Sequence, residues 1–246
     1  MWLAMFFTNT WAQDIVATLL TFAVALAWLR LMDALAARHV ISQTLSRKLI
    51  HIGTGPIFVL CWNLFSDQTA ARFLAALVPL AITAQFALVG AGVLKDPAAV
   101  QAMSRTGDRR EILRGPLYYG IVFVVCTLAF WLTSPAGILA LMLMCGGDGL
   151  ADLVGRRWGS AKLPLNPVKS WAGSAAMLIA GFAFAFVFVA FFSSLGLFGA
   201  RLGLADIAWR TGLIALAATL VEALPIRDLD NLTITATAVV LGILLF

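Results

Sequence analysis

Two aspartates and several basic residues lie close together in an otherwise apolar chain, between Cys145 and Ser174. Asp148 and Asp152 are four positions apart, a spacing that places two carboxylates on one face of a helix. Carboxylates in this arrangement can share a divalent cation such as Mg²⁺. The alternative is an ion pair between Asp152 and Arg156, which are also four positions apart. That pair would leave Asp148 unexplained, because no basic residue lies three or four positions from it.

Basic and small residues follow the aspartates and could bind phosphate groups. A helix that begins after Lys169 would present free N–H groups and the positive end of its dipole to an anion, with the Ser170 and Ser174 hydroxyls nearby. The alternative is that the cations anchor the chain at a membrane surface. The sequence contains no GxxxxGK[ST] motif, so a P-loop is absent. The cations of this stretch are Arg156, Arg157, Lys162 and Lys169.

A second acidic segment, VEALPIRDLDNLTIT, lies near the end of the chain. Glu222 is at the end of an apolar stretch, where an unpaired carboxylate is costly. Asp228, Asp230 and Asn231 follow it. The two aspartates could form only a solvated turn, and Asp230 with Asn231 would suit the N-cap of a helix. A third segment, SRKLIHIGTG, contains Arg47, Lys48 and His51. His51 is a candidate general base, although a histidine at a membrane boundary is more often structural.

The composition is that of an integral membrane protein. Of the 246 residues, 62% are hydrophobic and only 12% are charged, with a mean hydropathy of +0.96. The net charge of +5 therefore indicates basic loops near anionic membrane lipids rather than nucleic-acid binding. Three cysteines and two histidines favour neither a disulfide framework nor a histidine-rich metal centre.

The apolar runs predict an all-α, polytopic bundle of about eight transmembrane helices. Merging the run 117–145 into one helix would give seven, but Thr133 to Gly137 interrupt that run, and Pro135 suits the first turn of a new helix. With eight spans, 14 of the 17 Lys and Arg residues lie on one side, which the positive-inside rule identifies as cytoplasmic, and both termini lie outside. The expected spans are 15–31, 50–65, 70–94, two within 117–156, 172–192, 207–223 and 232–246.

No repeat or long linker divides the chain, so we expect one membrane-embedded domain, residues 1–246. Its polar segments near 46–55, 105–119, 145–174 and 222–231 would all face the cytoplasm. Carboxylates for Mg²⁺, cations for phosphates and an apolar interior for a lipid tail together indicate phosphoryl or nucleotidyl transfer to a lipid.

Four segments, SRKLIHIGTG, RGPLYYG, CGGDGLADLVGRRWG with KLPLNPVKSWAGS, and LPIRDLDNLTI, resemble the phytol kinase and dolichol kinase family, which is related to CDP-diacylglycerol synthases. The resemblance covers residues 46–241. It implies a CTP-dependent, Mg²⁺-requiring kinase of a long-chain isoprenoid alcohol such as phytol, geranylgeraniol or a polyprenol. The nucleotide and metal site that it implies comprises Asp148, Asp152, Gly155, Arg156, Lys162, Lys169, Gly173 and Ser174, completed by Glu222, Asp230 and Asn231, with Arg47, Lys48 and His51 nearby.

Within this set we expect Asp148, Asp152 and Asp230 to bind the metal, and Asp148, Asp152, Glu222 and His51 to be the catalytic candidates. The synthase signature KD…P-x-HGG-x-x-D-x-x-D is absent, which argues against cytidylyl transfer to phosphatidic acid. Phosphorylation of diacylglycerol and cytidylyl transfer remain alternative activities, and a transporter or scaffold is a third. The expected location is the bacterial inner membrane, with the active site facing the cytoplasm.

Overall fold

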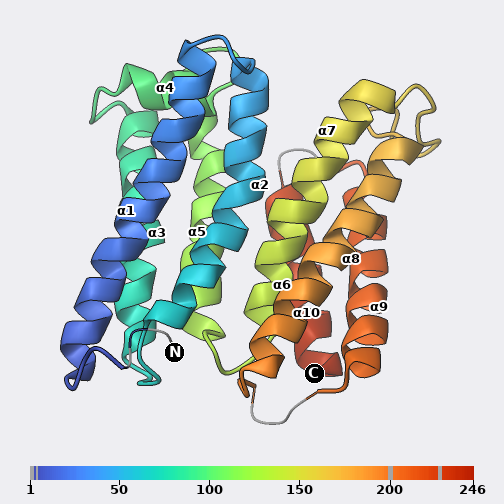
Figure 1. Ribbon diagram of the computed structural model, residues 1–246. Coiled ribbons are helices and arrows are strands. Elements are labelled where there is room, and N and C mark those ends of the chain that lie inside the picture. The colour runs from blue at the N-terminus through green and yellow to red at the C-terminus, as the bar shows by residue number, and fades with distance from the viewer. Residues whose placement is uncertain (1–2, 4, 199–201, 227–228) are drawn as a thin grey trace. The chain divides into compact units, whose positions relative to one another are not determined.

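The computed structural model describes residues 3, 5–198, 202–226 and 229–246 (Figure 1). Arg227 and Asp228, which belong to the predicted active-site segment 222–231, lie outside the described residues. Throughout the described ranges the regular secondary structure is helical, apart from one isolated bridge between two loop residues. The predicted all-α fold is therefore confirmed.

The chain forms two compact units, Met1–Leu128 (unit 1) and Ala129–Phe246 (unit 2). The predicted active-site segments 46–55 and 105–119 belong to unit 1, whereas 145–174 and 222–231 belong to unit 2. The single domain expected over residues 1–246, with these four segments in one site, stays a prediction.

Unit 1 is a bundle of long helices joined by shorter elements. In chain order these are α1 (Thr10–Ala37), α2 (Gln43–Cys61), the 3₁₀ turn η1 (Trp62–Leu64), α3 (Ala71–Ala91), α4 (Pro97–Met103), the 3₁₀ turn η2 (Arg109–Leu113) and α5 (Gly115–Ala129). α1 packs against α2 and α3, and α3 packs against η2. Phe58 of α2 contacts Phe123 of α5, with ring centroids 5.6 Å apart. The core of this unit is thus made of apolar side chains from several helices.

Unit 2 is built around one buried helix. Its elements are α6 (Ala136–Met142), the π-helical turn η3 (Leu143–Asp148), α7 (Gly149–Trp158), α8 (Trp171–Ser194), α9 (Leu204–Glu222) and α10 (Asp230–Leu245). All seven residues of α6 are buried, as expected of a helix that is apolar on every side. α8 packs on η3, α7 and α9, and α10 packs on α6 and α9. The buried helix α6 therefore leads directly into η3 and α7, which contain Asp148 and Asp152.

Six helices in the described residues are long and apolar enough to cross a membrane. α10 is apolar but shorter, and α2 is not among the six because the polar residues in its first half lower its mean hydropathy. These helices confirm the polytopic membrane architecture. The count of eight spans and the location of both termini outside stay predictions. The six are α1, α3, η2 with α5, α6 continued through α7, α8 and α9.

The predicted break in the run 117–145 is confirmed. α5 ends at Ala129, and α6 begins directly after Pro135, which is its N-cap residue. From there the chain remains helical through η3 and α7 to Trp158, close to the predicted end near Arg156. The proline fits because its missing N–H is not needed at a helix start.

Two other expectations were wrong. α2 begins at Gln43, where the Ser42 side chain caps it, and not near Ile50, so Arg47 and Lys48 lie on a helix rather than in a loop. The polar segment after α3, expected to be a loop, contains α4, whose first residue is Pro97 and whose N-cap is Asp96. An aspartate followed by proline is a typical helix start that the apolar pattern alone does not reveal.

Candidate active site

The α7–α8 loop, residues 159–170, lies at the end of unit 2 where α9 finishes and α10 begins (Figure 1). The loop is closed by backbone hydrogen bonds. Leu163 N donates to Lys169 O at 3.2 Å, and Trp171 N donates to Ala161 O at 3.1 Å. Between these bonds Lys162 pairs with Ser170 in an antiparallel bridge. The backbone of Lys169 is therefore held in a defined position beside the ends of α9 and α10.

Lys169 connects Glu222 and Asp230, which lie far along the chain from Asp148 and Asp152. Its Nζ donates to Glu222 Oε1, at the last residue of α9, and to Asp230 Oδ2 at 3.0 Å, at the first residue of α10. Glu222 is only 3% exposed. The structure thus brings together Lys169, Glu222 and Asp230, which the sequence analysis assigned to one site.

The environment of Lys169 is strongly acidic. Burial lowers the pKa of its ammonium group, but the negative charges of Glu222, Asp148 and Asp230 outweigh this effect, so the pKa is raised above the usual value for lysine. Lys169 therefore remains positively charged in the folded protein. The contribution of Asp148 also indicates that this carboxylate lies within electrostatic reach of Lys169.

Three polar atoms of unit 2 are buried without a hydrogen-bond partner among the described residues, and two of them, Glu222 Oε2 and Ser174 Oγ, belong to predicted site residues; the third is Arg210 Nε. A buried polar atom that lacks a partner costs about 1–3 kcal/mol. Such atoms in a folded protein often mark a place that a ligand completes. One oxygen of Glu222 is thus bound to Lys169, while the other is available to accept a proton or a hydrogen bond.

Asp148 and Asp152 have different surroundings. Asp148 is the last residue of the π-helical turn η3 and precedes α7, so it lies at the junction between two helical geometries. Asp152 accepts from Arg156 Nε at 2.8 Å, in a pair whose side chains are 27% and 53% exposed. The ion pair considered as the alternative is therefore present. It does not involve Asp148, and metal binding by either aspartate stays a prediction.

The predicted nucleotide-binding glycines lie where α7 and α8 pack most closely. A Cβ atom on Gly155 would lie 3.3 Å from Ser170 Oγ and 3.6 Å from Gly173 Cα, and one on Gly173 would lie 3.1 Å from Ala151 O. Gly147 and Gly181 form a second close contact, because a Cβ on Gly147 would lie 3.3 Å from Gly181 Cα. The glycines thus allow the two helices to approach, and their predicted role in nucleotide binding is not tested by this packing.

The predicted helix start after Lys169 is confirmed, since Ser170 is the N-cap of α8. Several of its first N–H groups already have partners. Ser170 Oγ accepts from Gly173 N at 3.2 Å, and Ser170 O accepts from Ser174 N at 2.9 Å. A phosphate bound here by backbone N–H groups would have to replace some of these bonds. The buried Ser174 hydroxyl has no hydrogen-bond partner among the described residues, so it could donate to a phosphate without breaking an existing bond.

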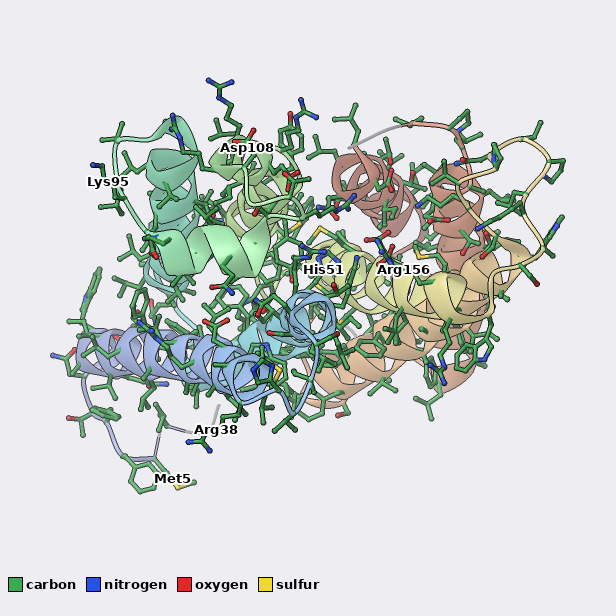
Figure 2. All side chains as sticks on the ribbon, turned by 90° about the horizontal axis from the view of Figure 1, so that it is seen from above. Met5, Arg38, His51, Lys95, Asp108 and Arg156 are labelled. Carbon is green, nitrogen blue, oxygen red and sulfur yellow. The ribbon has the colours of Figure 1, made fainter. Side chains whose placement is uncertain are left out.

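The candidate residues of unit 1 lie on α2. Arg47 donates from Nη1 to Ser104 O at 2.7 Å, and its neighbour Lys48 is half-buried. The ring of His51 lies 4.6 Å from that of Tyr119, whose hydroxyl donates to His51 O at 2.7 Å. Tyrosines at membrane boundaries are commonly anchors, so Tyr119 was not predicted to be a site residue. Figure 2 labels His51 in a view from above.

The predicted segment 105–119 is organised around Glu111. Its carboxylate accepts from the backbone N of Arg105 and, at 2.8 Å, from Thr106 Oγ1. These bonds hold the turn that leads into η2 and α5. Arg109 donates to Gly90 O at 3.2 Å and ties the turn to α3. Structural bonds therefore account for much of the polarity of this segment.

The remaining candidates and one residue that the sequence analysis missed belong to unit 2. Lys162 has an exposed side chain on the α7–α8 loop, and Asn231 lies in the first turn of α10. Asn166 was not predicted to have a role, yet it is 6% exposed and its Nδ2 donates to Ala223 O and Leu224 O at 3.3 and 3.2 Å. The Asn166-Pro167 pair, a typical turn sequence, was the only local pattern that pointed to this residue.

No group of three or more His, Cys, Asp or Glu side chains within the described ranges is arranged to hold a metal ion by itself. A Mg²⁺ ion that arrives bound to a nucleotide does not need three protein ligands. Mg²⁺ is usually bound through one or two carboxylates together with phosphate oxygens of the substrate. Asp148 and Asp230, both close enough to influence the pKa of Lys169, fit that requirement.

The sequence is similar to plant kinases over nearly its whole length. It is 44% identical over 237 residues to a probable chloroplastic phytol kinase of Triticum aestivum, covering 94% of this chain and 77% of that protein. It is 38% identical over 241 residues to the chloroplastic phytol kinase 1 of Arabidopsis thaliana, covering 97% and 79%. The chloroplastic farnesol kinase of the same plant is 41% identical over 244 residues, covering 98% and 78%. No protein-family model matches the chain, and no solved structure matches it significantly.

Proposed function

The chain belongs to the phytol kinase family, and we propose that it transfers the terminal phosphoryl group of CTP to the hydroxyl of a long-chain isoprenoid alcohol. Its relatives carry the names phytol kinase and farnesol kinase, and the similarity extends over both units. Phytol, geranylgeraniol and polyprenols are the substrates to test first. The alcohol would lie in the bilayer with its hydroxyl at the membrane surface.

The observation that carries the proposal is the buried carboxylate of Glu222. One of its oxygens is bound by Lys169 and the other has no partner. Phosphoryl transfer from a nucleotide to an alcohol requires that the hydroxyl lose its proton as the new O–P bond forms. Glu222 Oε2 would accept that proton, and Lys169 would hold the carboxylate in position. A proton acceptor within hydrogen-bonding reach of a hydroxyl typically contributes about 10²–10⁴ to the rate.

The nucleotide and the metal are the finer parts of the proposal. Asp148 and Asp230 would bind a Mg²⁺ ion that arrives with the nucleotide, and Asp152 would assist after release from Arg156. The bound ion would neutralise charge on the phosphate oxygens. The cations Arg156, Lys162 and Lys169 and the hydroxyls of Ser170 and Ser174 would contact the triphosphate. Asn231, Gly155 and Gly173 complete the proposed set within unit 2. Arg47, Lys48 and His51 lie on α2 of unit 1, and their part in catalysis or nucleotide binding stays a prediction.

The proposed location is a membrane, supported by the apolar helices. We propose that the phosphorylating site faces the compartment that contains the nucleotide, which is the cytoplasm if the positive-inside rule applies. The comparisons give no support to the expected bacterial inner membrane, because the relatives are named as chloroplastic plant proteins.

The test uses purified protein in lipid nanodiscs with CTP that carries a labelled terminal phosphate. We expect a labelled lipid monophosphate with at least one of phytol, geranylgeraniol and polyprenol, together with release of CDP. Release of pyrophosphate and a CMP-linked lipid would instead identify a cytidylyltransferase, and phosphatidic acid from diacylglycerol would identify the other alternative kinase. Absence of any lipid monophosphate with CTP, ATP, GTP or UTP would refute the proposal.

The Asp148→Asn variant separates the enzyme from a transporter or scaffold. In the proposed kinase this change weakens the binding of CTP with Mg²⁺, because it removes one carboxylate from the metal site. In a scaffold the binding of both would be unchanged. Equilibrium binding of a fluorescent CTP analogue, with and without Mg²⁺, distinguishes the two outcomes.

A further inference from the structure

We infer that Asn166 is a positioning residue, which holds the α7–α8 loop against the end of α9 and so presents Lys169 to Glu222 and Asp230. The inference rests on the proposed function, since it assigns Asn166 a role in the same site. It concerns contacts within unit 2 only.

Asn166 uses nearly all of its hydrogen-bonding capacity inside the protein. Its side-chain Nδ2 donates to Ala223 O and Leu224 O, at 3.3 and 3.2 Å, and its Oδ1 accepts from Val168 N at 3.3 Å. Its backbone carbonyl accepts from Lys169 N at 3.0 Å. The side chain of Asn166 therefore joins the loop to the end of α9, and its backbone carbonyl joins the same residue to Lys169.

The two carbonyl groups that Asn166 binds belong to Ala223, the C-cap residue of α9, and to Leu224, which follows it. α9 finishes at Glu222, and the last carbonyls of a helix have no partner within it. Pro225 follows and lacks an N–H, which prevents a further helical turn. The amide of Asn166 donates to both Ala223 O and Leu224 O, and Leu224 O also accepts from Ile226 N at 2.8 Å. This capping places the loop immediately beside Glu222.

Every third residue of the loop from Leu163 to Lys169 points toward the protein, and exposed residues lie between them. Leu163 is 8% exposed and Asn166 6% exposed, and Lys169, three positions further on, reaches inward to Glu222. Leu165 and Val168 between them are 77% and 74% exposed. Asn166 therefore lies between a buried leucine and Lys169, and both Asn166 and Lys169 contact the end of α9.

The consequence for the reaction is geometric. Lys169 carries a flexible side chain, and its two ion pairs depend on where the loop places its backbone. Loss of the Asn166 contacts would let the loop move away from α9, which would separate the ammonium group from both carboxylates. A displacement of about 1 Å at a phosphoryl-transfer site can lower the rate by about 100-fold.

The test is a double-mutant cycle with Asn166→Ala and Lys169→Met, measured as kcat/KM for alcohol phosphorylation. We expect Asn166→Ala alone to reduce kcat/KM by about 10- to 100-fold. In the Lys169→Met background the same change should alter kcat/KM by less than about twofold, because the lysine that it positions is absent. Equal effects in the two backgrounds would show that Asn166 does not act through Lys169.

A matched control is available in unit 1. Asn63 is 2% exposed and its Nδ2 donates to Leu60 O at 3.1 Å, so it also binds a carbonyl at a helix end. Asn63→Ala should lower the thermal stability to a similar extent while leaving the KM for CTP and the pH profile unchanged. If Asn166→Ala behaves in the same way as Asn63→Ala, the contact is merely structural and the inference is wrong.

A readout that does not depend on activity separates this inference from the proposed function. We expect the rate of Lys169 acetylation by an amine-reactive reagent, followed by mass spectrometry, to rise at least about tenfold in Asn166→Ala, because loss of both ion pairs exposes the amine. No such rise is expected in Asn63→Ala. An unchanged rate in Asn166→Ala would overturn the inference, whether or not the protein phosphorylates an alcohol.

Discussion

Lys169 and Asp230, 61 positions apart in the chain, meet with Nζ 3.0 Å from Oδ2 at one end of unit 2. The same ammonium group is bound by Glu222, so one cation links the loop before α8, the end of α9 and the start of α10. Each of these three segments was identified from its charges alone. Their meeting at one lysine makes this cluster the part of the predicted site that is most open to experiment.

Replacing Lys169 with Met should impair both stability and activity. The substitution leaves Glu222 buried without a counter-charge, and breaking a buried pair costs up to about 3–5 kcal/mol. Because the Lys169 side chain is 24% exposed, we expect a smaller loss of about 2 kcal/mol. Thermal unfolding in detergent measures it. The double variant Lys169→Met/Glu222→Gln should regain stability but not activity, and failure to regain stability would argue against the pair as its source.

Glu222→Gln tests the proposed proton acceptor. Gln retains an oxygen that accepts from Lys169 but is not a base, so kcat should fall about 100-fold or more, while the KM for CTP changes by less than about twofold. The control is Asp206→Asn, an exposed acid in the first turn of the same helix, which should leave both constants unchanged. A kcat close to that of the wild type would exclude Glu222 as the base.

Asp152→Asn separates the ion pair from the proposed metal site. The pair with Arg156 is partly exposed, and such pairs contribute only about 0.3–0.5 kcal/mol, so the thermal midpoint should hardly move. If Asp152 assists in binding the metal, the Mg²⁺ concentration that gives half-maximal activity should rise at least about tenfold. Arg156→Gln breaks the same pair and serves as the control for its loss. An unchanged Mg²⁺ requirement would limit Asp152 to the ion pair.

Gly159→Ala should destabilise the contact between the loop and α7. A methyl group at this position would lie 2.1 Å from Gly155 O and 2.4 Å from Ser170 Oγ, and the backbone carbonyl cannot move aside. We expect a loss of about 1–3 kcal/mol in the free energy of unfolding. Gly115→Ala is the matched control, since no heavy atom lies within 4 Å of the added group, and its effect should be within about 0.5 kcal/mol. Equal stability of the two variants would contradict the close packing.

The raised pKa of Lys169 predicts a flat alkaline response. A lysine whose pKa is higher in the folded than in the unfolded state contributes its stabilisation in full below the unfolded value of about 10.4, and loses it only as the pH rises through the folded value. The difference in thermal midpoint between the wild type and Lys169→Met should therefore be constant from about pH 7 to about pH 10. A difference that shrinks between pH 7 and pH 9 would show that the lysine deprotonates early.

The sequence predicted well those features that follow from local patterns. Apolar runs of sufficient length predicted most of the long helices, and Pro135 marked the start of α6. The spacing of Asp152 and Arg156 predicted their ion pair correctly as one of two interpretations. These features depend on residues close together in the chain, where helix geometry alone decides which side chains meet.

Features that depend on tertiary packing were missed. The polar first half of α2 reads as a loop because its helical form is fixed by Ser42 as a cap and by contacts with its neighbours, including the Arg47 bond to Ser104 O. The two bonds from Asn166 to the end of α9 join residues 57 and 58 positions apart, and no local pattern specifies them. The site as a set was predicted from charge and resemblance, whereas its internal geometry required the fold.

The π-helical turn η3 determines the direction in which the acidic segment points. A π turn closes its hydrogen bonds over one more residue than an α turn, so removing one residue from Leu143–Asp148 would convert it into ordinary α-helix. Because successive residues of an α-helix are rotated by about 100°, Asp148 and Asp152 would then turn by about that angle relative to the buried residues of α6. The π-helical turn therefore sets the direction of the Asp148 and Asp152 carboxylates, whereas the apolar residues of α6 set how that helix packs in the core.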